Sequence, residues 1–150
     1  MAAVGLRRFV RSERGAELLE FALALPLLLL VLAGILDMGF LFKDYEVVTN
    51  AAREGARMAS LPGWSEDDVK ARVAAYLTAG GYQGTATTTV TEVVIADVNG
   101  RSINGVKVKV DAPHTYLILG PIAELVQSAQ LATTTLHAAS TMRSEVAAGL

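Results

Sequence analysis

The sequence contains no cysteine, which excludes disulfide bonds, thiolate metal sites, cysteine nucleophiles and lipid attachment through a thiol. Its only histidines are His114 and His137, and no serine-hydrolase, phosphate-loop or zinc-protease motif accompanies them. Charged residues make up only 19% of the 150 residues, and the formal net charge is −2. The chain therefore lacks the excess of basic residues that is typical of nucleic-acid-binding proteins. We therefore expect no enzymatic activity, no cofactor, no metal and no nucleic-acid partner.

Apolar residues are abundant instead, at 52% of the chain, and they are concentrated near the N-terminus. A charge-free run covers Phe21–Leu36, and after the single Asp37 the apolar sequence resumes over Met38–Phe42. As a helix with a rise of about 1.5 Å per residue, this stretch would be about 33 Å long, enough for a hydrocarbon core of about 30 Å. The sequence predicts one transmembrane helix.

The distribution of charge predicts how this helix is oriented. Four arginines and one glutamate precede Gly15, whereas the rest of the chain carries nine basic and fourteen acidic residues. The positive-inside rule then places the N-terminus in the cytoplasm and the residues beyond about 43 outside. Asp37 would lie near the outer interface, where we expect it to be solvated and assign it no function. A cleaved secretory signal and a plain uncleaved anchor are the alternatives for this segment.

Glu20 is a carboxylate at the inner edge of the apolar run. A charge deep in a bilayer costs several kcal/mol unless it finds a partner or reaches the interface. Two interpretations therefore remain open: Glu20 pairs with another charged group, or its side chain extends to the interface beside Arg14. Gly15 and Ala16 stand just before the run, with Glu20 as the fifth residue counted from Ala16.

The stretch Arg14–Phe21 (RGAELLEF) resembles the class III signal of type IV pilin-like proteins. That signal has a basic leader, a cut after a glycine and a glutamate at mature position five. The continuation, GAELLEFALALPLLLLVLAGILDMGF and then Val48–Arg57 (VTNAAREGAR), resembles the TadE-like family of minor pilins, or pseudopilins, of the tight-adherence (Flp, type IVb) pilus. The resemblance covers Arg14–Ser60 and, more loosely, Ala138–Glu145.

The resemblance implies a function in pilus assembly. A prepilin peptidase would cut between Gly15 and Ala16, and Glu20 would pair with the freed amino group of Ala16 in a neighbouring subunit, neutralising two costly charges. The implied partners are the peptidase, the major Flp pilin, other minor pilins and the inner-membrane assembly platform. The implied location is the cytoplasmic membrane, as a single-pass protein, and the pilus fibre. The alternative is a membrane-anchored extracytoplasmic binding domain that does not enter a pilus.

The helical pattern continues past the membrane. Small residues recur at a spacing of four, at Ala51, Gly55 and Ala59, and side chains of this size let another backbone approach closely. The partner of this small-residue stripe is either the domain's own sheet or another subunit. Leu61-Pro62-Gly63 should end this amphipathic stalk helix.

The remaining sequence predicts a small mixed domain. Ser65 and Asp68 form an N-cap for a helix whose apolar stripe is Val69, Val73, Tyr76 and Leu77, with Gly80-Gly81 as its stop. Strands are expected at Thr85–Ala96 and Val106–Asp111, joined by a connection that contains both Asn99-Gly100 and Asn104-Gly105. A turn at Gly120-Pro121, a helix over Ile122–Gln127 and a strand over Leu131–Met142 should follow.

The expected fold class is α+β: one transmembrane helix continues into a long stalk helix, which packs on a small antiparallel sheet with short helices, as in a pilin-like lollipop. The expected segments are a cleaved leader at 1–15, the transmembrane helix at 16–43, the stalk helix at 44–61 and the exported domain at 62–150.

Overall fold

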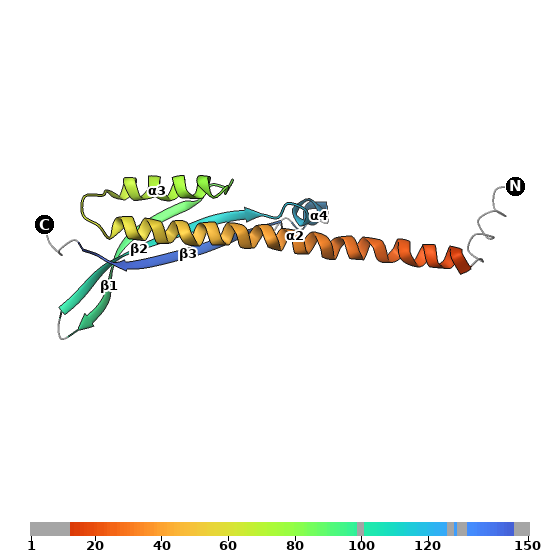
Figure 1. The fold of residues 1–150 in the computed structure, drawn as a ribbon, viewed down its shortest axis with the longest axis horizontal. Coiled ribbons are helices and arrows are strands. Elements are labelled where there is room, and N and C mark those ends of the chain that lie inside the picture. The colour runs from red at the N-terminus through yellow and green to blue at the C-terminus, as the bar shows by residue number, and fades with distance from the viewer. Residues whose placement is uncertain (1–12, 99–100, 126–127, 129–131, 146–150) are drawn as a thin grey trace.

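One long helix organises the whole molecule. The computed structural model describes residues 13–98, 101–125, 128 and 132–145, and within them α2 (Glu13–Ala59) runs unbroken for 47 residues, through Pro26. The other elements lie beside the C-terminal half of α2, and the N-terminal half of α2 extends away from them (Figure 1). These elements are α3 (Glu66–Ala79), β1 (Thr87–Val98), β2 (Arg101–Thr115), α4 (Leu119–Leu125) and β3 (Thr133–Arg143).

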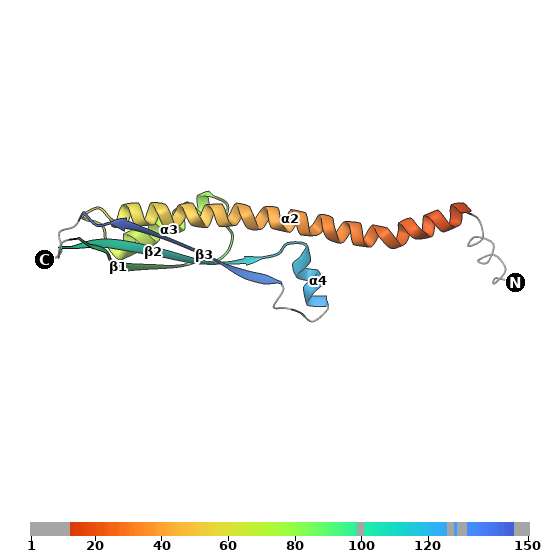
Figure 2. The ribbon, with the colours of Figure 1, turned by 90° about the horizontal axis from the view of Figure 1, so that it is seen from below.

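The domain has two layers. The strands form an antiparallel sheet in the order β1-β2-β3, and α2 lies along one face of it with α3 at its side (Figure 2). Alternate residues of β2 point to that face and are buried, as strand geometry requires. The core between the layers is formed by Val48, Ala51, Ala52, Ala56, Val69, Val73, Leu77, Tyr82, Val106, Val108, Val110, Ala112, Leu136 and Ala138. The α+β class and the packing of the long helix on the sheet are thus confirmed.

Helix α3 begins and ends with the predicted signals. The Ser65 hydroxyl accepts from the Asp68 backbone N–H at 3.2 Å, and the Asp68 carboxylate accepts from the Ser65 backbone N–H at 3.0 Å, which completes a capping box. At the other end Gly81 has a φ of +74°, which favours glycine. Of the predicted stripe, Val69, Val73 and Leu77 are buried, but Tyr76 lies at the surface.

The predicted hairpin connection was too long. Strand β2 already begins at Arg101, so Asn104-Gly105 lies within the strand, and Asn99-Gly100 falls outside the described residues. Gly105 is needed for a different reason. A Cβ atom there would lie 2.7 Å from the Met142 carbonyl oxygen and would also collide with the Ile95 side chain. The glycine therefore permits a close approach between strands and does not form a turn.

The segment after β2 also differs from the prediction. Gly120-Pro121 is not a turn before a helix, because both residues lie inside the first turn of α4, where proline needs no hydrogen-bonded N–H. The predicted helix end at Gln127 falls outside the described residues, as does Leu131 at the start of the last predicted strand. Strand β3 pairs with β2 from Gly105↔Arg143 to Thr115↔Thr133.

Glu54 joins the two helices of the domain. Its carboxylate accepts hydrogen bonds from Arg57, one turn later in α2, at 3.2 Å and from Arg72 of α3 at 2.9 Å. The bonds to Arg72 and then to Arg57 hold the pKa of this carboxyl below its usual value of 4.5. The pairing of Glu54 with Arg57 is the one expected from their spacing of three residues on one helix.

The variant Glu54→Gln should be less stable than the parent chain at pH 7 by no more than about 1 kcal/mol, as for other solvent-accessible ion pairs. Because the folded pKa is depressed, the stabilisation is fully present above pH 4.5 and is lost as the pH falls through the folded pKa. Urea unfolding of both chains in detergent micelles should show their stabilities converging at acid pH. Glu46→Gln, at an exposed position of the same helix, is the control. A difference that stays constant down to acid pH would contradict this account.

Candidate functional site

The N-terminal half of α2 is an apolar surface that nothing in the described chain covers. Leu23, Leu27 and Phe21 are 72%, 67% and 61% exposed, and the first buried residue of the described helix is Ala33. A core helix of a soluble domain would bury such side chains. Helix α2 is long and apolar enough to cross a membrane, and its exposed half is the part with that composition. This surface suits anchoring in a lipid bilayer.

The predicted processing and pairing residues all lie at the start of α2. Ala16 and Glu20 are exposed and stand four residues apart, so they occupy neighbouring positions on one helix face. Within the described part of the chain no hydrogen bond or ion pair involves the Glu20 side chain. The leader arginines Arg7, Arg8 and Arg11 lie outside the described residues. The Glu20 carboxylate is thus available to pair with a group outside the described part of the chain.

Asp37 is not solvated, contrary to the prediction. It is 1% exposed, and its carboxylate accepts from the backbone N–H groups of Leu117, Ile118 and Leu119 at distances between 2.7 and 3.2 Å. These N–H groups precede and begin α4, whose cap position is occupied by Ile118, a residue with no side-chain acceptor. Asp37 therefore caps α4 from another element, and its negative charge suits a helix N-terminus.

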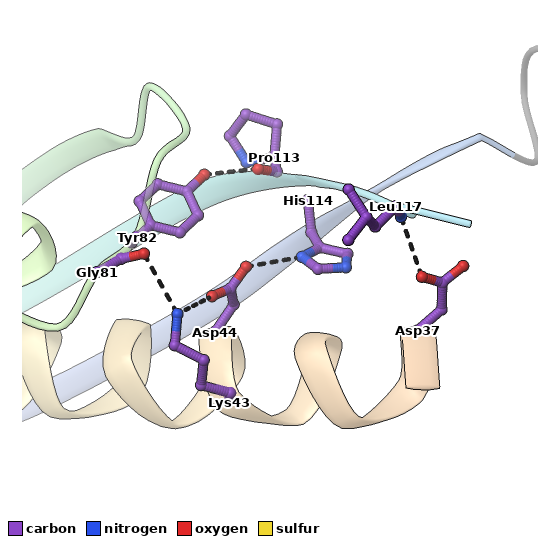
Figure 3. A network of polar contacts seen from close by, with 8 residues as sticks. All are labelled: Asp37, Lys43, Asp44, Gly81, Tyr82, Pro113, His114 and Leu117. Atoms are coloured by element: carbon purple, nitrogen blue, oxygen red, sulfur yellow. Dashed lines mark hydrogen bonds and ion pairs between the residues drawn. The ribbon is translucent and has the colours of Figure 1, made fainter. Parts of the chain in front are cut away.

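A polar network continues along the same face of α2 toward the domain (Figure 3). The Asp44 carboxylate lies 2.8 Å from Nδ1 of His114 on β2, and Lys43 donates to the Gly81 carbonyl at 3.2 Å. The Tyr82 hydroxyl donates to the Pro113 carbonyl at 2.6 Å. These contacts tie α2 to β2 and to the segment between α3 and β1. Together with the Asp37 contacts, they set the direction in which the apolar half of α2 leaves the domain.

The small-residue stripe packs within the chain. Ala51 is fully buried, and Gly55 lies so close to its neighbours that a Cβ atom there would be 2.6 Å from Val73 of α3 and 3.2 Å from Val108 of β2. Ala59, the third member, is half-buried against the same core. The sequence left open whether this stripe packs against the chain's own domain or against another subunit. In the structure it packs against the chain's own domain.

Sequence reasoning missed two of these residues, Asp37 and His114. Asp37 could have been noticed because it interrupts an apolar run while the later helix lacks a capping side chain at Ile118. His114 carried no local signal, because its partner Asp44 is 70 residues away. Among the described residues no group of three or more acidic or histidine side chains is placed to hold a metal ion.

Comparison with known protein families finds a match in the N-terminal part of the chain. Residues 15–57 match the model of the TadE-like protein family, over nearly the whole of α2. This N-terminal segment is thus similar to the TadE-like family. Neither the curated proteins nor the solved structures contain a significant match to it. The TadE-like family is a structural family associated with the Tad pilus system.

The match divides the chain into two parts. The matched part contains the predicted cleavage site, the apolar surface, Asp37 and most of the small-residue stripe. The elements outside the match are α3, the sheet and α4, although all of them pack against α2 or against each other. The similarity to the family thus concerns the apolar helix, and the α+β domain is interpreted from its own geometry.

Proposed function

We propose that this chain is a TadE-like minor pilin, or pseudopilin, that acts in the assembly of a tight-adherence (Flp, type IVb) pilus. In this proposal α2 spans the cytoplasmic membrane with its N-terminus inside, and the domain stands on the outer side. The observation that carries the proposal is the exposed apolar half of α2, which begins directly at a processing-type sequence and belongs to the matched segment. The work of such a protein is mechanical and associative and needs no catalytic group.

The dimensions of α2 support a membrane span. Phe21–Phe42 would be about 33 Å long at about 1.5 Å per residue, which fits a hydrocarbon core of about 30 Å. The carboxylate within this stretch, Asp37, is buried against three N–H donors and does not face lipid. Its satisfied hydrogen bonds reduce the cost of placing a charge near the membrane.

The arrangement of Ala16 and Glu20 supports assembly through the membrane. Cleavage after Gly15 would create a positively charged amino group on Ala16, which is costly in an apolar environment without an anionic partner. Glu20 has a negatively charged carboxylate, and this carboxylate lacks a partner within the described chain. Since the two positions are one turn apart on one helix, a neighbouring subunit shifted along the helix axis would bring its amino group to this carboxylate.

The proposed partners follow from the resemblance to the TadE-like family. The prepilin peptidase would act at Gly15-Ala16, and the major Flp pilin, other minor pilins and the inner-membrane assembly platform would contact the apolar surface of α2. The small-residue stripe at Ala51, Gly55 and Ala59 is occupied by the domain. Contacts between subunits would therefore form mainly along the N-terminal half of the helix.

The experiment that tests the proposal is a measurement of the intact mass and N-terminal sequence of the protein from native membranes and from sheared surface fibres. We expect a chain that begins at Ala16, present in both fractions. A chain that retains residues 1–15 would support a plain membrane anchor, and a start beyond Gly34 would support a secreted domain. Either result would overturn the proposal. A chain that begins at Ala16 but never reaches the fibres would support an assembly factor that stays in the membrane.

The variant Glu20→Ala should remain in the membrane but lose its incorporation into fibres, because the amino group of the neighbouring subunit would have no counter-charge in lipid. Fibre content is measured by immunoblotting of sheared fractions relative to the membrane fraction. Glu17→Ala is the matched control, since Glu17 is also an exposed acidic residue at the start of α2. If Glu20→Ala assembles as well as Glu17→Ala, the charge pairing is wrong and the binding-domain alternative gains support.

A further inference from the structure

A second apolar surface lies beside α2, on and before α4. It consists of Leu117, Ile122 and Leu125, which are 67%, 43% and 84% exposed, and we name it the α4 edge. Large apolar side chains gathered in so short a segment are a feature of surfaces that contact a partner or a membrane. Glu124 is the only charged residue of the sequence between Thr115 and Leu136. The sequence on either side of the α4 edge is therefore nearly free of charge.

The position of the α4 edge along α2 is set by Asp37. The N–H groups of Leu117–Leu119 are bound to the Asp37 carboxylate, so α4 begins at the level of this residue. The exposed apolar surface of α2 continues beyond that level, since Met38, Phe40 and Phe42 are 47%, 44% and 67% exposed. At about 1.5 Å per residue, Phe42 lies roughly 8 Å farther from the N-terminus than Asp37. A bilayer that covers these side chains therefore reaches the start of α4.

The direction of α4 agrees with this position. Figure 2 shows α4 crosswise to α2, and Figure 1 shows it nearly end-on beside the long helix. When α2 stands across the bilayer, α4 lies along its surface, as interfacial amphipathic helices do. Its buried residues, Gly120 and Ala123, occupy one side, and Ile122 and Leu125 are left exposed.

An apolar groove lies between α2 and the start of α4. It has a volume of about 550 Å³ and is lined from α2 by residues such as Ile35, Met38 and Phe42, and on the other side by Tyr116 and by Leu119, the first residue of α4. Aromatic side chains at this level, including Tyr116 and the exposed Tyr45, are typical of the membrane–water interface. The groove lies on the same side of the bilayer as the α4 edge and opens on the surface of the spanning helix.

We propose that the α4 edge is a second membrane contact, which inserts into the outer interfacial layer of the bilayer that α2 spans and binds phospholipid acyl chains. The proposal rests on the membrane span in the proposed function. It follows from the continuity of the apolar surface from α2 to α4 and from the attachment of α4 at Asp37. The exported domain is then not suspended on a free stalk but rests on the membrane at one edge until it is extracted.

The absence of cysteine allows a direct test, because one introduced cysteine is the only site for a thiol-reactive fluorophore. The full chain with Leu125→Cys, labelled with an environment-sensitive dye, is inserted into vesicles of phosphatidylethanolamine and phosphatidylglycerol that contain a trace of nitroxide-labelled lipid. We expect quenching severalfold greater than at Val94→Cys, with a nitroxide near the headgroups acting more strongly than one near the bilayer centre. Val94 is the matched control, since it is 63% exposed and lies on β1, away from α4.

Leu29→Cys reports on the membrane span separately. A deeply placed nitroxide should quench it most, and its failure to do so would overturn the span on which both proposals rest. If Leu29 is quenched but Leu125 behaves as Val94 does, the α4 edge is solvated and only the present inference is wrong. If the dye at Leu125 is shielded without quenching by lipid, and the shielding disappears on dilution with lipid, a second copy of the chain covers the edge. That result would also overturn lipid as the ligand.

Discussion

Replacing Asp37 by alanine should release α4 from the long helix. The carboxylate accepts from three backbone N–H groups, and a buried hydrogen bond to a charged group contributes about 1.5–3 kcal/mol. We expect the free energy that protects the amides of Leu117–Leu119 from hydrogen exchange to fall by about 3 kcal/mol, because these donors would be left without an acceptor. The amides of Val108 and Val110, in the core of β2, should keep their protection.

Two further variants test whether the Asp37 carboxylate is the cause of this protection. Asp37→Asn should lose protection as well, because Oδ1 and Oδ2 both accept, and an amide replaces one acceptor with a donor in either orientation. Glu46→Ala removes an exposed carboxylate from the same helix and should leave the exchange of Leu117–Leu119 unchanged. Unchanged exchange in Asp37→Ala would show that α4 is held by its apolar contacts and not by the cap.

The second large effect is expected at Gly55, which lies where α2, α3 and the sheet meet. A leucine there would place its Cβ 2.6 Å from Val73 and 3.2 Å from Val108, both of which are fully buried. Overpacking of this kind costs typically about 1–3 kcal/mol, and the confined site favours the upper end of this range. We expect Gly55→Leu to lower the free energy of unfolding by about 3 kcal/mol. Gly55→Ala should lose less, because it adds only the Cβ atom to this confined site.

Gly39→Leu is the matched control for Gly55→Leu. Gly39 lies in the same helix, and a Cβ there would meet no described atom within 4 Å. Its substitution by leucine should leave the free energy of unfolding unchanged or raise it slightly. The measurement is unfolding in detergent micelles, followed by circular dichroism. Equal destabilisation by both variants would mean that α2 responds to leucine itself and not to the packing at Gly55.

Local patterns in the sequence were sufficient for most elements. The uncharged run before Asp37, the box formed by Ser65 and Asp68 and the alternation over Val106–Asp111 are short-range signals, and each corresponds to an element of the structure. The turn residues were less informative, because asparagine-glycine pairs and glycine-proline pairs serve more than one purpose. Asn104-Gly105 permits close packing of strands, and Gly120-Pro121 begins a helix.

The long apolar helix, the α+β domain and the TadE-like N-terminal segment could all be predicted from the sequence. These properties depend on composition, periodicity and motifs within a few turns of one another. The roles of Asp37 and His114 could be seen only in the folded chain, since their partners are 80–82 and 70 residues away. A charged residue in an apolar run is solvated or buried according to which N–H groups the fold brings to it, and no local pattern contains that information.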